Sequence, residues 1–260
     1  MSRLSRSELA QFLSHAIIRL MEDSESDFGV PIPGSVLLPE QWAKTALKKL
    51  PPPGPLDWQS LFGRVAPIIL DLGCGNGRCV ISSALLRPDC DHLGCDILPL
   101  VIRYATKRAN QRGLANVRLA VIGAFEFLEQ YAGPGSIQEI HLYHPQPYKD
   151  SERAYKRLIT PEFLSLVHHS LAPQGLVVLQ TDNRAYWNYI RRVAPLLFDF
   201  EELKGTWPDA PQGRTRREIY ARQHKLQIFR GQGTPKPNIT AAQVAEIIQS
   251  QPPPRFDAGR

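Results

Sequence analysis

The chain has 260 residues, of which 43% are hydrophobic, enough for one sizeable core with appended segments. Lys and Arg outnumber Asp and Glu by 31 to 25, and the net charge of +6 is in the direction of a polyanionic partner, although an ordinary basic protein can have the same balance. The N-terminus lacks an apolar signal region and no eighteen apolar residues run together, so we expect an intracellular, cytoplasmic protein with no membrane partner.

The cysteines and histidines do not indicate a metal site. Cys74, Cys79, Cys90 and Cys95 are spaced too widely for zinc-binding C-x-x-C pairs, and we interpret them as free thiols in a reducing compartment. His141 and His144 lie close together in sequence, but no third ligand accompanies them. We therefore expect no bound metal.

The first fifty-six residues are predicted to form an N-terminal extension. Apolar residues recur on one helical face over residues 7–21, with Ser7 as a suitable cap, and predict a helix. Residues 29–39 and 51–55 are rich in Pro and Gly and predict irregular connections around a short helix over residues 40–50. The lysines of that helix face either water or RNA.

From residue 61 onward, short apolar runs alternate with helical patterns, which predicts an α/β fold with a mostly parallel sheet and helices on both faces. The seven expected strands are residues 68–72, 92–95, 117–122, 137–143, 176–181, 198–203 and 220–229, the last of them antiparallel. The expected helices are residues 78–86, 99–113, 124–131, 161–171 and one that continues through residue 192. Ligands of such sheets bind at the carboxyl ends of the strands.

The composition changes again after Gly231. Residues 234–238 predict a linker, residues 240–248 a short helix with a capping box at Thr240 and Gln243, and residues 252–260 a disordered tail. We therefore divide the chain into residues 1–56, a catalytic domain over residues 57–231, and residues 232–260.

A glycine-rich loop follows the first strand of the predicted domain, in the stretch PIILDLGCGNG. Gly73, Gly75 and Gly77 allow a tight turn and a close approach of a ligand to the backbone, as in nucleotide-binding βαβ units. Asp71 in this loop would repel a pyrophosphate but suits the sulfonium and ammonium groups of S-adenosylmethionine. Asp96 ends the second strand, where a ribose presents its hydroxyls. We therefore favour S-adenosylmethionine over NAD as the cofactor.

Several motifs occur together in a fixed order. They are PLDWQSLFGR, DLGCGNG, the loop YHPQPYKDSERAYKRL, TPEFL at residues 160–164, the pair Thr181 and Asp182, and T-x-x-E from Thr215 to Glu218. With this set, residues 57–231 resemble the bacterial tRNA (guanine-N7-)-methyltransferase family. The resemblance implies a Rossmann-like class I methyltransferase fold with a seven-stranded sheet, S-adenosylmethionine as methyl donor and tRNA as substrate.

The resemblance also implies roles for individual residues. Asp71, Asp96 and the three loop glycines match donor-binding positions, and Gly123 and Ala124 occupy a donor-binding position after the third strand. Asp182, Gln146 and Glu218 match the catalytic positions, and the substrate-binding positions correspond to Lys149, Asp182, Thr215 and Glu218.

The substrate loop departs from the family form F-P-D-P-W-x-K. Gln146 replaces the loop acid, Tyr148 replaces the Trp, and Asp150 displaces or replaces the first basic residue. Gly123 stands where the family usually has an acid. The donor site is therefore largely retained, whereas the substrate loop is altered.

Guanine N7 carries a lone pair and no proton, so methylation there needs positioning more than a general base. Acids such as Asp182 and Glu218 can stabilise the cationic product, while Gln146 brings hydrogen bonds but no charge. The expected function is N7 methylation of guanine in tRNA. The alternatives are a methyltransferase with a different RNA or small-molecule substrate, and a non-catalytic RNA-binding relative.

Simpler roles are open for some of these residues. Asp182 can serve as a helix N-cap. The arginines at positions 214, 216, 217 and 222, and the pair Lys156 and Arg157, can contact RNA phosphates or simply face water. The sequence predicts neither the oligomeric state nor the contacts of the two terminal segments.

Overall fold

The computed structural model describes residues 25–149 and 151–258. The helix expected over residues 7–21 lies outside these residues. The described chain forms an eight-stranded sheet with the order β3-β6-β5-β4-β7-β8-β10-β9, together with a separate hairpin of β1 (Ser26–Asp27) and β2 (Val30–Pro31). The eight strands are β3 (Ala46–Leu47), β4 (Ile68–Leu72), β5 (Asp91–Asp96), β6 (Val117–Val121), β7 (Ile137–Tyr143), β8 (Leu171–Thr181), β9 (Phe198–Leu203) and β10 (Phe229–Pro235).

Strands β3 to β8 pair in parallel, and β10 is antiparallel to both β8 and β9. The mostly parallel sheet and its antiparallel last strand confirm the predicted fold class. The α-helices are α2 (Trp58–Phe62), α3 (Arg78–Leu86), α4 (Pro99–Gln111), α5 (Ala124–Gln130), α6 (Pro161–Ser170), α7 (Arg184–Leu197), α8 (Arg216–Gln223) and α9 (Ala241–Ser250). No described helix is both long and apolar enough to cross a bilayer.

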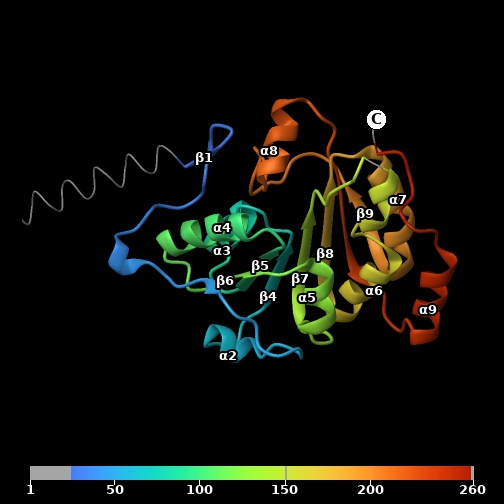
Figure 1. The fold of residues 1–260 in the computed structure, drawn as a ribbon, viewed down its shortest axis with the longest axis horizontal. Helices are drawn as coiled ribbons and strands as arrows, with labels where there is room; N and C mark the ends of the chain where they lie inside the picture. The colour runs from blue at the N-terminus through green and yellow to red at the C-terminus, as the bar shows by residue number, and fades with distance from the viewer. Residues whose placement is uncertain (1–24, 150, 259–260) are drawn as a thin grey trace, which may run out of the picture.

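Helices cover both faces of the sheet, as Figure 1 shows. On one face, α3 and α4 pack on β6 through a cluster that includes Ile81, Ala105 and Leu119. On the other, α5, α6 and α7 pack over a larger core that includes Phe163 and Trp187. Because both faces are buried, the central strands are uniformly apolar, as a parallel sheet requires.

The prediction of a helix over residues 40–50 is wrong. That segment contains a 3₁₀ turn, η1 (Pro39–Gln41), and then strand β3, which adds the eighth strand at the edge of the sheet. Asn110 accounts for the difference, because its Oδ1 accepts hydrogen bonds from both the backbone N and the Oγ1 of Thr45 at 2.8 Å. The Thr45 carbonyl then accepts from Leu119 N on β6.

The strand expected over residues 220–229 is also wrong. Thr215 caps α8, which continues to Gln223, and the strand begins only at Phe229. A Cβ at Gly231 would lie 2.4 Å from Cζ of Phe200, so glycine is what allows β10 to pair closely with β9. The boundary expected at residue 231 and the start of the expected linker at residue 234 both fall inside β10.

The described part of the tail, residues 252–258, is packed, in contrast to the disorder expected over residues 252–260. Phe256 contacts the rings of Tyr186 and Tyr189 on α7, and Ala258 is 1% exposed. The aromatic partners of Phe256 lie on α7, more than sixty residues earlier in the chain. The composition of the tail alone therefore does not reveal that it packs. The predicted capping box of α9 is present, with Thr240 and Gln243 as its members.

Candidate functional site

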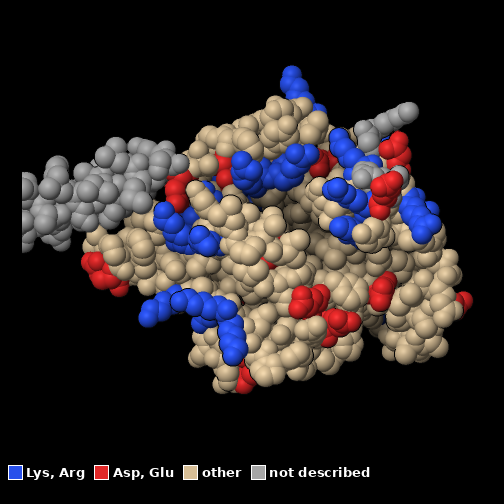
Figure 2. Space-filling model, viewed as in Figure 1, with Lys and Arg blue, Asp and Glu red and all other residues tan. Residues whose placement is uncertain are grey.

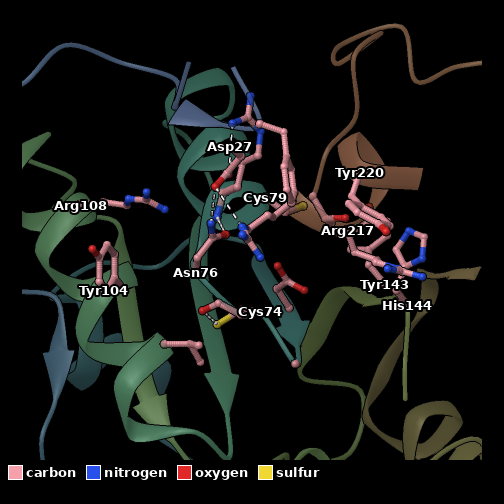
Figure 3. Close-up of a pocket in the computed structure, with 18 of the residues that line it drawn as sticks. Asp27, Cys74, Asn76, Cys79, Tyr104, Arg108, Tyr143, His144, Arg217 and Tyr220 are labelled. Atoms are coloured by element: carbon pink, nitrogen blue, oxygen red, sulfur yellow. Dashed lines mark hydrogen bonds and ion pairs between the residues drawn. The ribbon is translucent and has the colours of Figure 1, made fainter. Parts of the chain in front are cut away.

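A cavity of about 760 Å³ lies at the carboxyl ends of the central strands. Its wall combines the glycine loop, the β1–β2 turn, α4, the end of β7 and the start of α8 (Figure 3). Tyr104 and Arg108 lie on one side, and Tyr143, His144 and Arg217 lie on the other. The cavity therefore extends from the end of β4, where the donor was expected, to the end of β7, where the substrate was expected.

The glycine loop has the geometry that its sequence predicts. Gly73, Gly75 and Gly77 have φ angles of 75°, 53° and 78°, which L-residues rarely adopt. A Cβ at Gly73 or Gly75 would meet nothing within 4 Å, so the backbone there is open to a ligand, whereas a Cβ at Gly77 would lie 2.7 Å from Cβ of Ala105. The loop forms an open cradle at two glycines and packs against α4 at the third.

Asp71 places a carboxylate in the wall of the cavity. Its side chain is only 4% exposed and its Oδ2 has no hydrogen-bond partner. Burial, and secondarily the charge of Asp96, raise the pKa of Asp71 to about 7. An unpartnered carboxylate in such a position is suited to a cationic ligand.

Asp96 ends β5 and is fixed by the backbone. Its Oδ2 accepts from Gly75 N at 3.1 Å and its Oδ1 accepts from Leu98 N at 2.9 Å, so the carboxylate lies against the glycine loop. Apolar side chains follow it on the surface, including Ile97, which is 65% exposed and lies near Gly123. Gly123 and Ala124 begin α5 beside this apolar patch and outside the wall of the cavity.

These features fit S-adenosylmethionine. Asp71 adds a carboxylate to the cavity wall, and no protein group neutralises its buried Oδ2, so it suits a sulfonium or an ammonium. The glycine cradle lacks side chains that would block the donor, and Asp96 has lone pairs beyond its two backbone hydrogen bonds that would accept from ribose hydroxyls. The exposed apolar side chain of Ile97 supplies surface for an adenine. The residues are thus appropriate for the donor in both charge and shape.

Asp182 follows β8 and is held by two partners. Nδ1 of His144 donates to its Oδ1 at 3.1 Å, and Arg217 donates to its Oδ2 at 2.5 Å. Burial alone would raise the pKa of Asp182, but the hydrogen bonds from His144 and Arg217 outweigh it and lower that pKa to about 2. The helix-cap role considered for Asp182 is wrong, because Asn183 caps α7.

A buried amide fixes the orientation of His144. Nε2 of Gln180 donates to Nε2 of His144 at 2.9 Å and to Glu218, and Oε1 of Gln180 accepts from Trp207. Because Nε2 of His144 is an acceptor, its proton lies on Nδ1 and faces Asp182. Neither Gln180 nor Trp207 was singled out from the sequence, since their importance depends on this chain of contacts.

Glu218 does not reach the cavity. It is fully buried, and its carboxylate accepts from Arg222 at 2.6 Å, from Arg230 at 3.4 Å and from the backbone N of Arg214 at 3.0 Å. The contact role expected for Glu218 is therefore replaced by an anchoring role beneath α8. Thr215 does line the cavity, but its Oγ1 accepts from Glu218 N as the cap of that helix.

The substrate loop lies at the rim. Gln146 and Lys149 are exposed and do not contribute to the cavity wall. Arg157, expected to contact either RNA or water, is only 2% exposed, and its guanidinium donates to backbone carbonyls, including that of Pro147 at 2.6 Å. It is thus a structural residue of the loop.

The β1–β2 turn is a part of the site that the sequence did not indicate. Asp27 is 2% exposed and accepts from Asn76 at 2.8 Å and from Arg78 at 3.3 Å. Phe28 contacts the ring of Tyr220 on α8, with centroids 5.5 Å apart, and so bridges the two sides of the cavity. The one available signal was Arg78, a cation at the start of a buried helix that requires a partner.

Basic side chains surround the hollow on the face drawn in Figure 2, over α8 and over the neighbouring corner near α7. The α8 arginines differ in their accessibility. Arg216 and Arg217 have side chains 60% and 50% exposed, whereas Arg214 is paired with Asp209 and Arg222 with the buried Glu218. Among the described residues, no group of three or more His, Cys, Asp or Glu side chains could hold a metal ion.

Comparisons with known proteins agree with this geometry. The family described as "Putative methyltransferase" matches residues 65–233. The tRNA (guanine-N(7)-)-methyltransferase of Alkalilimnicola ehrlichii is 31% identical over 172 residues, which cover 66% of this chain and 73% of that protein. The protein of the same name from Paracidovorax citrulli is 32% identical over 160 residues, covering 60% of this chain and 64% of that one.

Solved structures support the fold. The 16S rRNA methyltransferase KamB superposes with a TM-score of 0.52 at 15% identity, covering 75% of this chain and 99% of that one. A 16S rRNA (adenine(1408)-N(1))-methyltransferase from Catenulisporales acidiphilia gives a TM-score of 0.50 at 16% identity, over 75% and 97% of the two chains. From the ordered motifs, the donor cradle and the relatives that match most of its length, we conclude that the chain belongs to the tRNA (guanine-N7-)-methyltransferase family.

Proposed function

We propose that this protein transfers a methyl group from S-adenosylmethionine to N7 of a guanine in tRNA, in the cytoplasm. The observation that carries the proposal is the position of two carboxylates in and beside one cavity. Asp71 lies in the cavity wall at the glycine cradle, and Asp182 lies across the cavity, against the lining residues His144 and Arg217. A cationic donor and a base that becomes cationic each require such a group.

The donor half acts by charge and close approach. S-adenosylmethionine supplies an electrophilic methyl group on a sulfonium. Asp71 would neutralise the cation, Asp96 would accept hydrogen bonds from the ribose hydroxyls, and the backbone at Gly73 and Gly75 would lie against the donor. The raised pKa of Asp71, about 7, would fall when a cation binds beside it.

The acceptor half acts by orientation. Asp182 is ionised at neutral pH because its pKa is about 2, and its position is fixed by His144. As N7 attacks, positive charge develops on the purine and a fixed carboxylate stabilises it. Arg217, half exposed at the rim, can exchange its bond with Asp182 for one with an RNA phosphate, which leaves an oxygen of Asp182 free for guanine.

Gln146 limits the rate in this scheme. The exposed loop presents a neutral amide where relatives with the F-P-D-P-W form have a carboxylate. Since the reaction requires position and charge but no proton removal, we expect slow transfer by the native protein. Loss of one electrostatic partner commonly costs about 100-fold in rate.

Mass spectrometry of nucleosides from tRNA incubated with the protein and S-adenosylmethionine tests the proposal. We expect 7-methylguanosine from the native protein, more of it from Gln146→Asp, and none from Asp182→Ala. Glu246→Gln, an exposed change on α9, is the control. If neither the native protein nor Gln146→Asp methylates tRNA while calorimetry still shows donor binding, N7 methylation of guanine in tRNA is wrong and a different substrate becomes the better hypothesis.

A further inference from the structure

The C-terminal strap, defined as residues 252–258, contacts the substrate loop at the buried side chain of Arg157. Nη1 of Arg157 donates to the carbonyl of Pro254 at 2.5 Å, and Cζ of the same guanidinium lies 3.7 Å from the centroid of the Phe256 ring. The contact joins segments 97 residues apart in sequence. Arg157 is buried because the strap covers it.

The same guanidinium holds the substrate loop. Its Nε donates to the carbonyl of Pro147 at 2.6 Å and its Nη2 donates to that of Tyr148 at 2.8 Å. The loop has an unusual backbone, because φ is 51° at His144 and 40° at Tyr148, in the left-handed region that non-glycine residues seldom adopt. External contacts are needed to maintain this shape, and Arg157 supplies two of them around Tyr148.

The strap also reaches the second strand end of the acceptor half. Nδ2 of Asn183, the residue after Asp182, donates to the carbonyl of Ala258 at 3.1 Å. The hydroxyl of Tyr189 on α7 donates to the carbonyl of Pro252 at 3.0 Å. One short segment thus contacts both the loop that carries Gln146 and the corner that carries Asp182. The hydrogen bonds that hold Asp96 come instead from the backbone of Gly75 and Leu98.

We propose that the C-terminal strap sets the acceptor half of the site, with Arg157 and Phe256 as positioning residues for methyl transfer. They touch neither donor nor guanine and act through the backbone of residues 147–148 and through Asn183. The test by methylation rate rests on the proposed function. The test by hydrogen exchange does not depend on that function.

The catalytic readout separates turnover from donor binding. We expect Phe256→Ala and Arg157→Ala to lower kcat for tRNA methylation by about 10- to 100-fold, because small displacements of positioning groups have effects of that size. The Kd for S-adenosylhomocysteine should change by less than about twofold, and this also verifies that the variants fold. Phe256→Tyr keeps the ring and should retain the native rate. Arg157→Lys keeps the charge but loses the planar fork and should behave like Arg157→Ala.

The matched control lies next to Phe256. Arg255 is exposed, and Arg255→Ala removes a positive charge from the same strap. This variant therefore distinguishes loss of the contact between Arg157 and Phe256 from a general loss of charge. The double variant Arg157→Ala with Phe256→Ala should lose no more than Arg157→Ala alone, since Phe256 acts on the loop through Arg157. Additive losses would contradict action through Arg157.

Hydrogen exchange provides the structural readout without RNA. Exchange of residues 144–157 should accelerate in Phe256→Ala and stay native in Arg255→Ala, while residues 68–77 remain unchanged in both. If the native protein does not methylate tRNA, the proposed function fails and the exchange experiment still tests the strap. Unchanged exchange of the loop in Phe256→Ala, or an unchanged kcat in an active protein, overturns the inference.

Discussion

Asp71 carries a buried carboxylate whose ionisation is linked to the ligand that it serves. Its pKa of about 7 means that it is protonated in much of the free protein below neutral pH. A cationic donor binds best to the ionised form, so the affinity for S-adenosylmethionine should rise by up to about tenfold per pH unit below that pKa and level off above it. Calorimetry from pH 5.5 to 8.5 measures this, and Asp71→Asn should give weak, pH-independent binding. A native affinity that is flat across that range would show that Asp71 does not meet the cation.

The same residue affects stability in the absence of donor. The pKa of Asp71 rises from an ordinary value of 3.8 to about 7 in the folded state, so the folded protein holds a proton that the unfolded chain releases in that interval. Its contribution is therefore most favourable below pH 4 and declines as pH rises toward 7. We expect Asp71→Asn to raise the free energy of unfolding at pH 8 and to have little effect near pH 4. Urea unfolding at the two pH values provides the comparison.

Glu218 is expected to matter for stability rather than for contact with guanine. Its loss would leave Arg230, which is 4% exposed, without its carboxylate partner. Breaking such a buried pair costs about 3–5 kcal/mol, so Glu218→Gln should lower the free energy of unfolding by about that amount. Glu246→Gln, on the exposed side of α9, should change it by less than about 0.5 kcal/mol. Normal stability with abolished methylation would instead restore the contact role that the T-x-x-E motif implied.

At the scale of elements, the β1–β2 hairpin is expected to act as a cover over the donor side. Asp27 connects it to Arg78, which is 5% exposed and also donates to the carbonyls of Val30 and Pro31. Asp27→Asn should therefore accelerate hydrogen exchange over residues 26–31 and weaken donor binding, with a local cost of up to about 3 kcal/mol. Glu40→Gln, an exposed change on η1, is the control. Native exchange in Asp27→Asn would mean that the carboxylate does not hold the hairpin.

Sequence reasoning succeeded where an element is long, periodic and locally determined. The strand, glycine loop and helix from residue 68 to residue 86 were predicted with correct bounds, because apolar run, glycine spacing and helical pattern agree. It failed at β1, β2 and β3, each of two residues, because their pairing depends on distant partners such as Asn110 and Arg78.

The candidate site divides in the same way. Asp71 and Asp96 were found because they lie near the ends of two strands beside a motif, and the structure places both at the glycine loop. The sequence could not show that the side chain of Glu218 points into the protein. Its partner Arg230 lies on β10, a strand that was predicted at the wrong residues. The burial of Arg157 depends on the strap at the far end of the chain.

For the whole molecule, the accessible cations determine how binding to RNA responds to salt. Lys225 is exposed just beyond α8, whereas Arg222 on that helix is paired with Glu218. In filter-binding titrations with tRNA, Lys225→Gln should reduce the slope of log K against log salt by about 1. Arg222→Gln should leave the slope unchanged and lower stability. Equal slopes for Lys225→Gln and the native protein would place the RNA elsewhere.

The order of strands in the sheet also affects how the nascent chain matures. Among the eight described strands of the sheet, β10 comes last in sequence, yet it lies inside the sheet between β8 and β9. Until residues 229–235 leave the ribosome, β8 presents an unpaired edge and β9 has no neighbour in the sheet, a state open to wrong pairing. The donor half, made of earlier strands, can assemble during translation, whereas the acceptor half has to wait until residues 229–235 have been made.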